Sequence, residues 1–359
     1  MIAKNKLDCC GCQKCKMDCP VGAIELKADQ AGFVYPVINK SKCLSCNKCS
    51  ASCTFKNRLK DSIETSSKSA IYAAKNRSEI DRMNSRSGGI FTAISDEFIF
   101  NDNIVYGCLL DDKWNVKHEK ANDLIIRNKF RGSKYVQSNI ASSFSSVKKD
   151  LDSGKYVLFT GTPCQVDAIQ SCIKNNENLY TLDVICYGVS SPQFWADYIQ
   201  YIEHKYNGKV EQFDFRDKRK FGWKAHNESF VINEKKYYSR EYSYFFKKQL
   251  SLRPSCFQCP YKTPNRISDI TLGDFWGIDK VCPEFYDNMG ISLVMINTEK
   301  GQVLWEKIKH KIIYQKISSE NYMQPSLTGA NGIPDLYTSF WNDYAKNGFS
   351  FVLNKYYDE

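Results

Sequence analysis

The middle of the chain, from about residue 90 to residue 310, alternates short apolar runs with stretches of helical periodicity. The runs "NIVYGCLL", "KYVLF", "LYTLDVIC" and "GISLVMI" each have the length of a buried strand. Ile90, Ile94 and Phe98 recur at the spacing of one helix face. We therefore expect strands and helices to alternate in an α/β or mixed α+β core.

The two ends of the chain have a different pattern. Residues 56–86 are rich in Lys, Ser and Asn around one strand-like run, "IYAAKN", and the segment from about residue 331 looks helical. We interpret "VGAIEL", directly after Pro20, as a turn and a short helix. The predicted organisation is an N-terminal domain (1–57), a linker with a first strand (58–84), a main domain (85–310) and a helical extension (311–359).

Nine of the 16 cysteines lie within the first 53 residues. They form two runs of the type C-x2-C-x2-C-x3-C, which is the spacing of bacterial two-cluster ferredoxins, where the fourth cysteine of each run binds the other cluster. We therefore expect a ferredoxin-like N-terminal domain with two [4Fe-4S] clusters. The expected ligands are Cys9, Cys12, Cys15 and Cys53 for one cluster, and Cys43, Cys46, Cys49 and Cys19 for the other.

A zinc ribbon is the alternative for these runs, since it also uses C-x2-C pairs. Zinc needs only four ligands per site, so two runs of four cysteines at this spacing favour iron-sulfur clusters. Cys10 fits neither run, and we interpret it as a buried or incidental thiol.

Four later cysteines stand in settings that suit metal binding. Two of them follow predicted strands, and the other two form another C-x2-C pair. Together they could hold a third cluster or zinc, and the spacing does not choose between the two. The four are Cys164, Cys186, Cys256 and Cys259, whereas Cys108, Cys172 and Cys282 are assigned to the core, where free cysteine is common.

A Ser-Gly-Gly sequence precedes the first predicted helix. Ser85 to Gly89 would form the N-terminus of this helix, whose free backbone N–H groups suit a phosphate. A plain helix cap is the simpler interpretation of the same residues.

Six motifs occur in the order found in the coenzyme F420 hydrogenase/dehydrogenase β-subunit family. They are "SRSGGIFTAI", "FRGSKYVQS", "TGTPCQ", "LDVICYGV", "CFQCPY" and "SDITLGDFWGI". The chain resembles this family over roughly residues 70–300, with the two-cluster module fused in front.

The resemblance implies an FAD enzyme with a [4Fe-4S] cluster close to the flavin, in a mixed α/β flavin-binding domain. It matches the cluster to the same four later cysteines. It also implies FAD-binding residues at Ser87, Gly88, Gly89, Ser133, Lys134, Tyr135, Thr162 and Gln165.

Hydride transfer to a flavin needs no protein acid or base. If the substrate also exchanges a proton, the weak candidates are Lys134, Tyr135, His226 and Asp274, each of which has a structural role as its simpler interpretation. The basic loop "RDKRKFGWK" suits a polyanionic substrate tail or an acidic ferredoxin, and a solvated loop is the default interpretation.

Composition and charge narrow the class of protein. The chain is globular in composition, begins without an apolar signal region and has no apolar run long enough to span a membrane, so we expect a cytoplasmic protein. Its net charge of +10 suggests nucleic acid at first. Three clusters with their thiolates and one FAD would remove about eight of those charges, so no nucleic-acid partner is expected.

The function expected from the sequence is an iron-sulfur flavoprotein oxidoreductase. It would transfer electrons between ferredoxin-type clusters and a small organic substrate or hydride carrier, such as coenzyme F420, through FAD. The expected partners are ferredoxin or another redox protein and a small-molecule hydride donor or acceptor, and a homo-oligomer is compatible with the sequence. The alternatives are a subunit that relays electrons to a partner enzyme, and a ferredoxin-dependent reductase of surface-polysaccharide biosynthesis.

Overall fold

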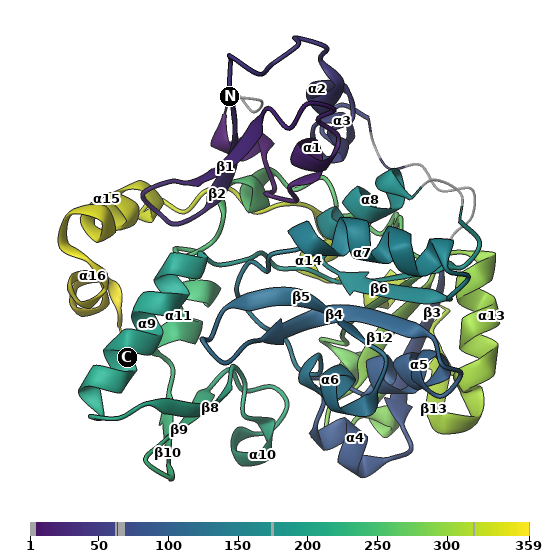
Figure 1. Cartoon of the computed structure of the whole chain (residues 1–359). Helices are drawn as coiled ribbons and strands as arrows, with labels where there is room; N and C mark the ends of the chain where they lie inside the picture. Colours follow the sequence, from purple (N-terminus) through teal and green to yellow (C-terminus); the bar gives the residue numbers. More distant parts are fainter. Residues whose placement is uncertain (1–4, 62, 64–68, 174–175, 319, 359) are drawn as a thin grey trace.

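The structure is a computed structural model of the whole chain, and it describes residues 5–61, 63, 69–173, 176–318 and 320–358. A mixed eight-stranded sheet runs through its centre in the order β13-β3-β12-β11-β7-β6-β4-β5 (Figure 1). These strands are β3 (Ala70–Asn76), β4 (Ile104–Leu110), β5 (Val116–Ala121), β6 (Val157–Gly161), β7 (Leu179–Val184), β11 (Ile270–Asp274), β12 (Ser292–Ile296) and β13 (Ile312–Lys316).

Four neighbouring strands of this sheet are parallel. β4 pairs with β6, β6 with β7, and β7 with β11, whereas the other pairings in the sheet are antiparallel. The carboxyl ends of the four parallel strands therefore meet along one edge, which is where ligands bind in open α/β sheets.

Helices cover both faces of the sheet. α5 (Ile90–Ile99) and α13 (Glu299–Ile308) pack on one face, and α7 (Ala141–Asp152) and α8 (Pro163–Cys172) pack on the other. Within β6, Leu158 faces the first layer, whereas Val157 and Phe159 face the second. A strand buried on both faces has an unbroken apolar sequence, which explains the run "YVLF". The predicted mixed α+β class is confirmed.

A second core, rich in aromatic residues, lies beside the sheet. Phe194 stands at its centre and contacts the rings of Phe245, Phe340 and Phe349. Its elements are α9 (Pro192–Lys205), β8 (Val210–Asp214), β9 (Glu228–Ile232), β10 (Lys235–Ser239), α11 (Glu241–Lys247), α15 (Tyr337–Asn347) and α16 (Phe349–Tyr356). The predicted helical tail is present as α15 and α16 and packs against this core. Residues 312–316 of the predicted helical extension instead form β13, the edge strand of the central sheet.

The N-terminal module, residues 5–61, stands on α8 at the top of Figure 1. It contains η1 (Lys6–Asp8), α1 (Lys14–Met17), β1 (Ile24–Ala28), β2 (Val34–Ile38), α2 (Lys48–Ala51) and α3 (Thr54–Arg58). α1 and α3 both contact α8.

The prediction of a short helix in "VGAIEL" is wrong. Ile24 to Ala28 form β1, which pairs antiparallel with β2. Ile24 is buried and Leu26 is half-buried, whereas Glu25 and Lys27 are exposed. This alternation has the period of a strand, and pairing with β2 satisfies the backbone groups that a helix would have bonded internally.

Short helices complete the chain. They are α4 (Glu79–Met83), α6 (Leu124–Lys129), α10 (Lys218–Phe221), η2 (Pro254–Gln258), α12 (Ile278–Val281), η3 (Pro283–Phe285), η4 (Lys309–Lys311), η5 (Glu320–Tyr322) and α14 (Pro325–Thr328). Within the described residues, every helix is too short or too polar to cross a membrane.

Candidate metal and cofactor sites

The structure brings together Cys9, Cys12, Cys15 and Cys53, which we call the inner set. Burial raises the pKa of Cys15, and the nearby thiols of Cys12, Cys9 and Cys53 raise it further. Burial likewise raises the pKa of Cys53 to about 11, with Cys12 and Cys9 among its neighbours. Cys53 therefore reaches the first cysteine run, which is the crossing that the ferredoxin spacing predicts.

The outer set consists of Cys19, Cys43, Cys46 and Cys49. Burial raises the pKa of Cys49, and the thiols of Cys19 and Cys46 add to this effect. Two of its sulfurs accept backbone hydrogen bonds, Cys19 from the N–H of Ala23 at 3.2 Å and Cys43 from the N–H of Ser45 at 3.4 Å. Cys46 is exposed to solvent, unlike every cysteine of the inner set.

Cys164, Cys186, Cys256 and Cys259 form a third set, from three separate stretches of chain. Cys164 lies in the first turn of α8, Cys186 two residues after β7, and the remaining pair at η2. Burial raises the pKa of Cys186 well above its usual range, and the thiols of Cys256, Cys164 and Cys259 raise it further. Burial and the nearby thiols of Cys164 and Cys256 raise the pKa of Cys259 to about 12.

These thiols suit iron-sulfur clusters better than single ions. Among the described residues, no group of three or more His, Cys, Asp or Glu side chains is placed to hold one metal ion. Zinc holds sulfur at about 2.3 Å and so draws its four ligands tightly together. A [4Fe-4S] cluster takes one thiolate at each of four irons, and its positive charge would ionise thiols that burial keeps protonated.

Cys10 lies between the inner and third sets. It is buried with Phe55 and Tyr261 in a small cluster against which Cys12, Cys53, Cys164 and Cys259 pack. Its thiol hydrogen-bonds with Cys12 and Cys164, which together with burial raises its pKa well above the usual range. The interpretation of Cys10 as a buried thiol is therefore correct, but its position between two cysteine sets was missed.

Arg253 joins the same two regions. Its buried guanidinium donates to the carbonyl of Cys9 at 2.7 Å, to the carbonyl of Val34 at 3.0 Å and to the side chain of Gln137 at 2.8 Å. It also approaches the Cys9 sulfur, with Nη2 at 3.7 Å. Arg253 was not predicted from the sequence, although it stands only three residues before Cys256.

A cavity of about 550 Å³ opens at the carboxyl ends of the parallel strands. Its size lies in the range of cofactor sites, and aromatic side chains from several elements line it, including Phe91, Phe130, Tyr187, Phe246 and Trp276. Cys186 also lines it, so the third set borders the cavity directly. The predicted FAD residues on its wall are Ser87, Gly89, Ser133, Lys134, Tyr135, Thr162 and Gln165.

Several of these predicted side chains are already engaged within the protein. The Ser87 hydroxyl donates to the carbonyl of Ile291, and the Gln165 side chain caps α8 by accepting from Thr162. The Lys134 ammonium donates to three carbonyls of its own loop, and burial lowers its pKa to about 8. These residues shape the cavity, and much of what they can offer a ligand comes from the backbone.

Gly88 and Gly89 are required for close packing at the start of α5. A Cβ atom on Gly88 would lie 2.3 Å from the Ala74 carbonyl oxygen, and Gly89 has φ of +80°. Gly88 is buried behind the cavity, where its N–H donates to Ser292, whereas Gly89 lines the cavity.

Unpartnered donors at one end of the cavity suit an anion. The Nε and Nη1 atoms of Arg86 and the hydroxyl of Ser85 are buried without a hydrogen-bond partner among the described residues, while Arg86 Nη2 pairs with Asp214. Buried donors without acceptors are costly, so a ligand phosphate there would satisfy them. This end of the cavity therefore fits the diphosphate of FAD.

A comparison with known protein families matches the later part of the chain, which includes the third cysteine set. Residues 154–320 match the family model for the C terminus of the beta subunit of coenzyme F420 hydrogenase/dehydrogenase. This segment belongs to that family. It contains all four cysteines of the third set.

Two further comparisons accompany this match. A chain from "Xenon derivatization of the F420-reducing [NiFe] hydrogenase complex from Methanosarcina barkeri" is 16% identical, with a TM-score of 0.49. The similarity covers 81% of this chain and 92% of that chain. A search of curated proteins found no match.

The family segment also supplies the polar end of the cavity. The Asp274 carboxylate accepts from Arg216 and from the Trp223 indole N–H, both at 2.7 Å. Arg216 also donates to the Tyr135 hydroxyl at 3.2 Å. Burial lowers the pKa of His226 to about 4, so this imidazole is neutral near pH 7. Asp274 therefore positions Arg216.

The prediction of a solvated loop in "RDKRKFGWK" is wrong for two of its five basic residues. Arg216 and Lys218 are buried, and the Lys218 ammonium donates to the carbonyls of Arg82, Ser87 and Met289. These carbonyls belong to α4, to the turn before α5 and to the loop before β12, so Lys218 fixes the cavity rim. Lys224 is exposed and pairs with Asp279.

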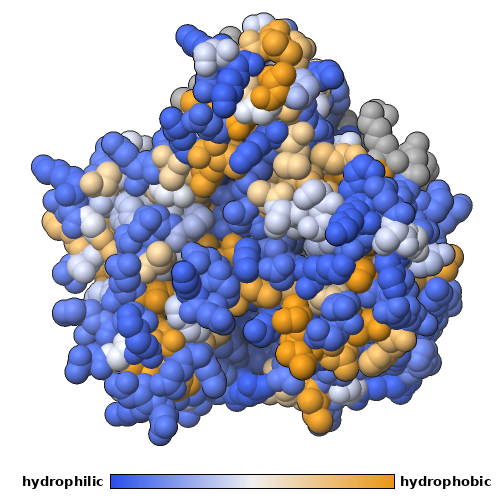
Figure 2. Space-filling model, in the orientation of Figure 1, coloured by the Kyte–Doolittle hydropathy of each residue, from blue (hydrophilic) through white to orange (hydrophobic). Residues whose placement is uncertain are grey.

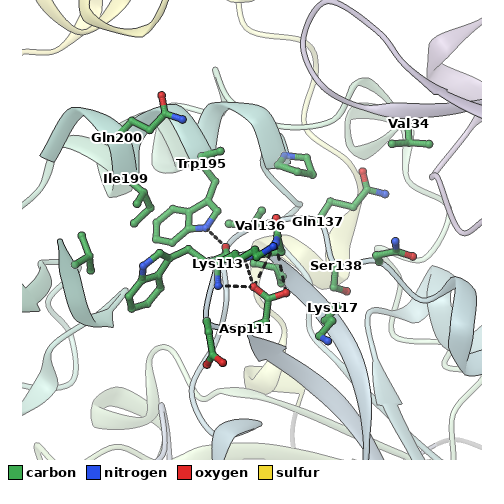
Figure 3. Close-up of a pocket in the computed structure, with 18 of the residues that line it drawn as sticks. Val34, Asp111, Lys113, Lys117, Val136, Gln137, Ser138, Trp195, Ile199 and Gln200 are labelled. Carbon is green, nitrogen blue, oxygen red and sulfur yellow. Dashed lines mark hydrogen bonds between the residues drawn. The ribbon is translucent and has the colours of Figure 1, made fainter. Parts of the chain in front are cut away.

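A larger cavity, of about 840 Å³, lies between the N-terminal module and α9. In the turn after β4, the Asp111 carboxylate accepts from the backbone N–H groups of Lys113 and Asn115 (Figure 3). The Trp195 indole donates to the carbonyl of Trp114 at 2.7 Å. None of the described cysteines lines this space, so its volume does not make it the redox site.

Proposed function

We propose that the chain is an iron-sulfur flavoprotein oxidoreductase that transfers electrons between ferredoxin-type clusters and a small organic hydride donor or acceptor. One observation carries this proposal. The third cysteine set borders the cavity through Cys186 and meets the inner set through Cys10. The inner set, the third set and the cavity therefore form one continuous series. The outer set extends it, because α1, which carries Cys15, contacts α2, which carries Cys49.

The cofactors follow from this series. The inner, outer and third sets would each hold a [4Fe-4S] cluster, and the cavity would hold FAD with its diphosphate at Arg86 and its ring near Cys186. A bound flavin exchanges hydride with an organic molecule and single electrons with clusters. The corresponding domains would be a ferredoxin-like domain at 1–57, a linker with a first strand at 58–84, the flavin and cluster domain at 85–310 and a C-terminal extension at 311–359. The extension begins with β13 of the central sheet and continues as helices.

The chain's own residues would bind and orient the reactants. Arg216, fixed by Asp274 and lying 5.2 Å from the Trp276 ring centroid, presents a fixed positive charge beside the cavity. Aromatic side chains line the same space. Near neutral pH, His226 is uncharged and is available to accept a proton if the substrate releases one.

The family match makes coenzyme F420 one hydride carrier to test. NAD(P)H is another hydride carrier to test, and sugar intermediates of surface-polysaccharide assembly are alternative substrates. A purely relaying subunit would need no cavity that admits a hydride donor. The wall of aromatic and cationic side chains beside Cys186 favours an enzyme with its own substrate.

The test begins with anaerobically purified protein. Three four-iron clusters predict about twelve irons per chain, together with one FAD released on denaturation. Reduced coenzyme F420 and NADPH are then added separately while flavin and cluster absorbance are followed. Bleaching by either donor without another protein supports the enzyme. Iron for two clusters only, with no flavin, would overturn the proposal, and reduction only in the presence of a partner enzyme would support the relay.

A further inference from the structure

The outer set lies at the surface of the N-terminal module, far along the series from the cavity. Cys46 is exposed, and neighbouring Leu44 is 67% exposed. The inner and third sets, in contrast, meet inside the molecule around Cys10. An external protein can therefore approach this series most closely at the outer set.

Apolar side chains surround the outer cysteines. Met17 and Val21, two residues to either side of Cys19, are 43% and 40% exposed, and Leu44 follows Cys43. Figure 2 shows apolar residues at the tip of the module, at the top of the view, among hydrophilic ones. Exposed apolar groups within a polar rim are typical of a protein interface.

The rim of this patch is basic. Residues 39–61 contain six Lys and Arg residues but a single acidic residue, Asp61. Exposed lysines stand at positions 16, 40, 42, 48 and 60. None of these five forms an ion pair within the described residues, although exposed lysines elsewhere do, such as Lys224 with Asp279. The unpaired charges are therefore free to attract an acidic surface.

We propose that Met17, Val21, Leu44 and the surrounding lysines form a docking surface for a small acidic iron-sulfur protein that carries single electrons. The inference rests on the proposed function, since it needs a cluster at the outer set. When the carrier acts as donor, it is oxidised by one electron and this chain is reduced by one. No proton or bond is transferred.

The experiment compares two triple variants with equal loss of charge. Lys40→Gln, Lys42→Gln and Lys48→Gln are combined in the docking variant, and Lys149→Gln, Lys280→Gln and Lys307→Gln in the control. The control lysines are also exposed and form no ion pair among the described residues. A photoreduced acidic [4Fe-4S] ferredoxin is mixed with each oxidised protein, and cluster reduction is followed by stopped flow.

At low salt, the docking variant should be reduced about ten-fold more slowly than wild type, because steering by opposite charges raises association rates. The control should stay within about two-fold, and added salt should bring wild type toward the docking variant. Reduced methyl viologen, a small cation that the lysines cannot attract, should not be slowed by the docking substitutions.

Equal rates with ferredoxin for the docking variant and the control would overturn the docking surface. So would reduction of the flavin while the outer cluster stays oxidised. Iron analysis and electron paramagnetic resonance of each protein separate these results from failure of the proposed function. If wild type shows no N-terminal clusters, both proposals are overturned.

Discussion

The N-terminal cysteines and the third cysteine set differ in how the chain assembles them. Each N-terminal run places three cysteines on one short loop, and one set reaches solvent at Cys46. The third set draws on α8, the end of β7 and η2, and its cysteines are half-buried beside a cavity. Local spacing thus reveals the first kind of site, whereas the second kind exists only when the sheet has formed.

The largest expected effect comes from breaking the third set alone. Cys164→Ser removes one ligand and should cost about four irons per chain, since one cluster is lost. A hydride donor that reduces the wild-type protein should still bleach the flavin of this variant, but the N-terminal clusters should stay oxidised. Iron analysis and electron paramagnetic resonance after donor addition provide the measurement. Cys172→Ser, at the other end of the same helix, is the matched control and should behave as wild type.

Removing the link between the two regions should have the next largest effect. Arg253→Met leaves the carbonyls of Cys9 and Val34 without their donor, which should lower the free energy of unfolding by about 1–3 kcal/mol for each unsatisfied group. It also removes the positive charge beside the Cys9 sulfur, so the reduction potential of the inner cluster should fall. A redox titration should show the outer cluster unchanged. Equal shifts in both clusters would contradict the assigned contact.

Acid should affect the main domain before the N-terminal module, which contains no histidine. Burial lowers the pKa of His118 to about 4, while its Nε2 bonds to the Thr160 carbonyl at 2.8 Å. The unfolded chain binds the proton more readily, so stability is complete above about pH 6.5 and declines as the pH falls toward 4, by up to about 3 kcal/mol.

Unfolding by denaturant at several pH values measures this decline. His118→Gln, whose side-chain amide can still donate to Thr160, should make the profile less steep over this range, with the remaining slope due to His226, whose pKa is also lowered by burial. His310→Gln, at an exposed position, should leave it unchanged. A wild-type profile that is already flat between pH 6.5 and 4 would contradict the assignment.

The smallest effect is expected at Cys10. Cys10→Ser keeps a hydrogen-bonding group between Cys12 and Cys164 but places a more polar atom in an apolar cluster. We expect all three clusters to assemble, with a loss of about 1 kcal/mol in stability. Cys10→Ala should retain the clusters but slow electron transfer between the inner and third sets in rapid-reaction measurements. Loss of a cluster in either variant would show that Cys10 is itself a ligand.

Much of the sheet was predictable, because β4, β6, β7 and β12 are short apolar runs in a chain that otherwise has helical periodicity. The grouping of the third set followed from its cysteines and from the family resemblance. The prediction for β1 was wrong because the expected turn and helix after the first cysteine run outweighed the clear alternation from Ile24 to Lys27.

What could not be predicted depends on partners that are distant in sequence. Arg253 and Cys9 are separated by 244 positions, and nothing in the local sequence around Arg253 indicates that contact. The same is true of Cys10, whose role depends on the docking of the module against α8. Ser87 and Gln165 lie in motifs that matched the family and so were predicted to bind FAD. The motifs do not reveal that both side chains already form hydrogen bonds within the protein.

The guanidinium of Arg253 donates a hydrogen bond to the backbone of Cys9. Cys256, a member of the third set, follows only three residues later in the chain. In proteins whose electron-carrying domain is attached by a flexible linker, that domain must move to its acceptor in every cycle. Here Arg253 and the contacts of α1 and α3 with α8 hold the two regions against one another. With clusters bound as proposed, electrons would cross this junction without a diffusional search, at a rate set by separation and driving force.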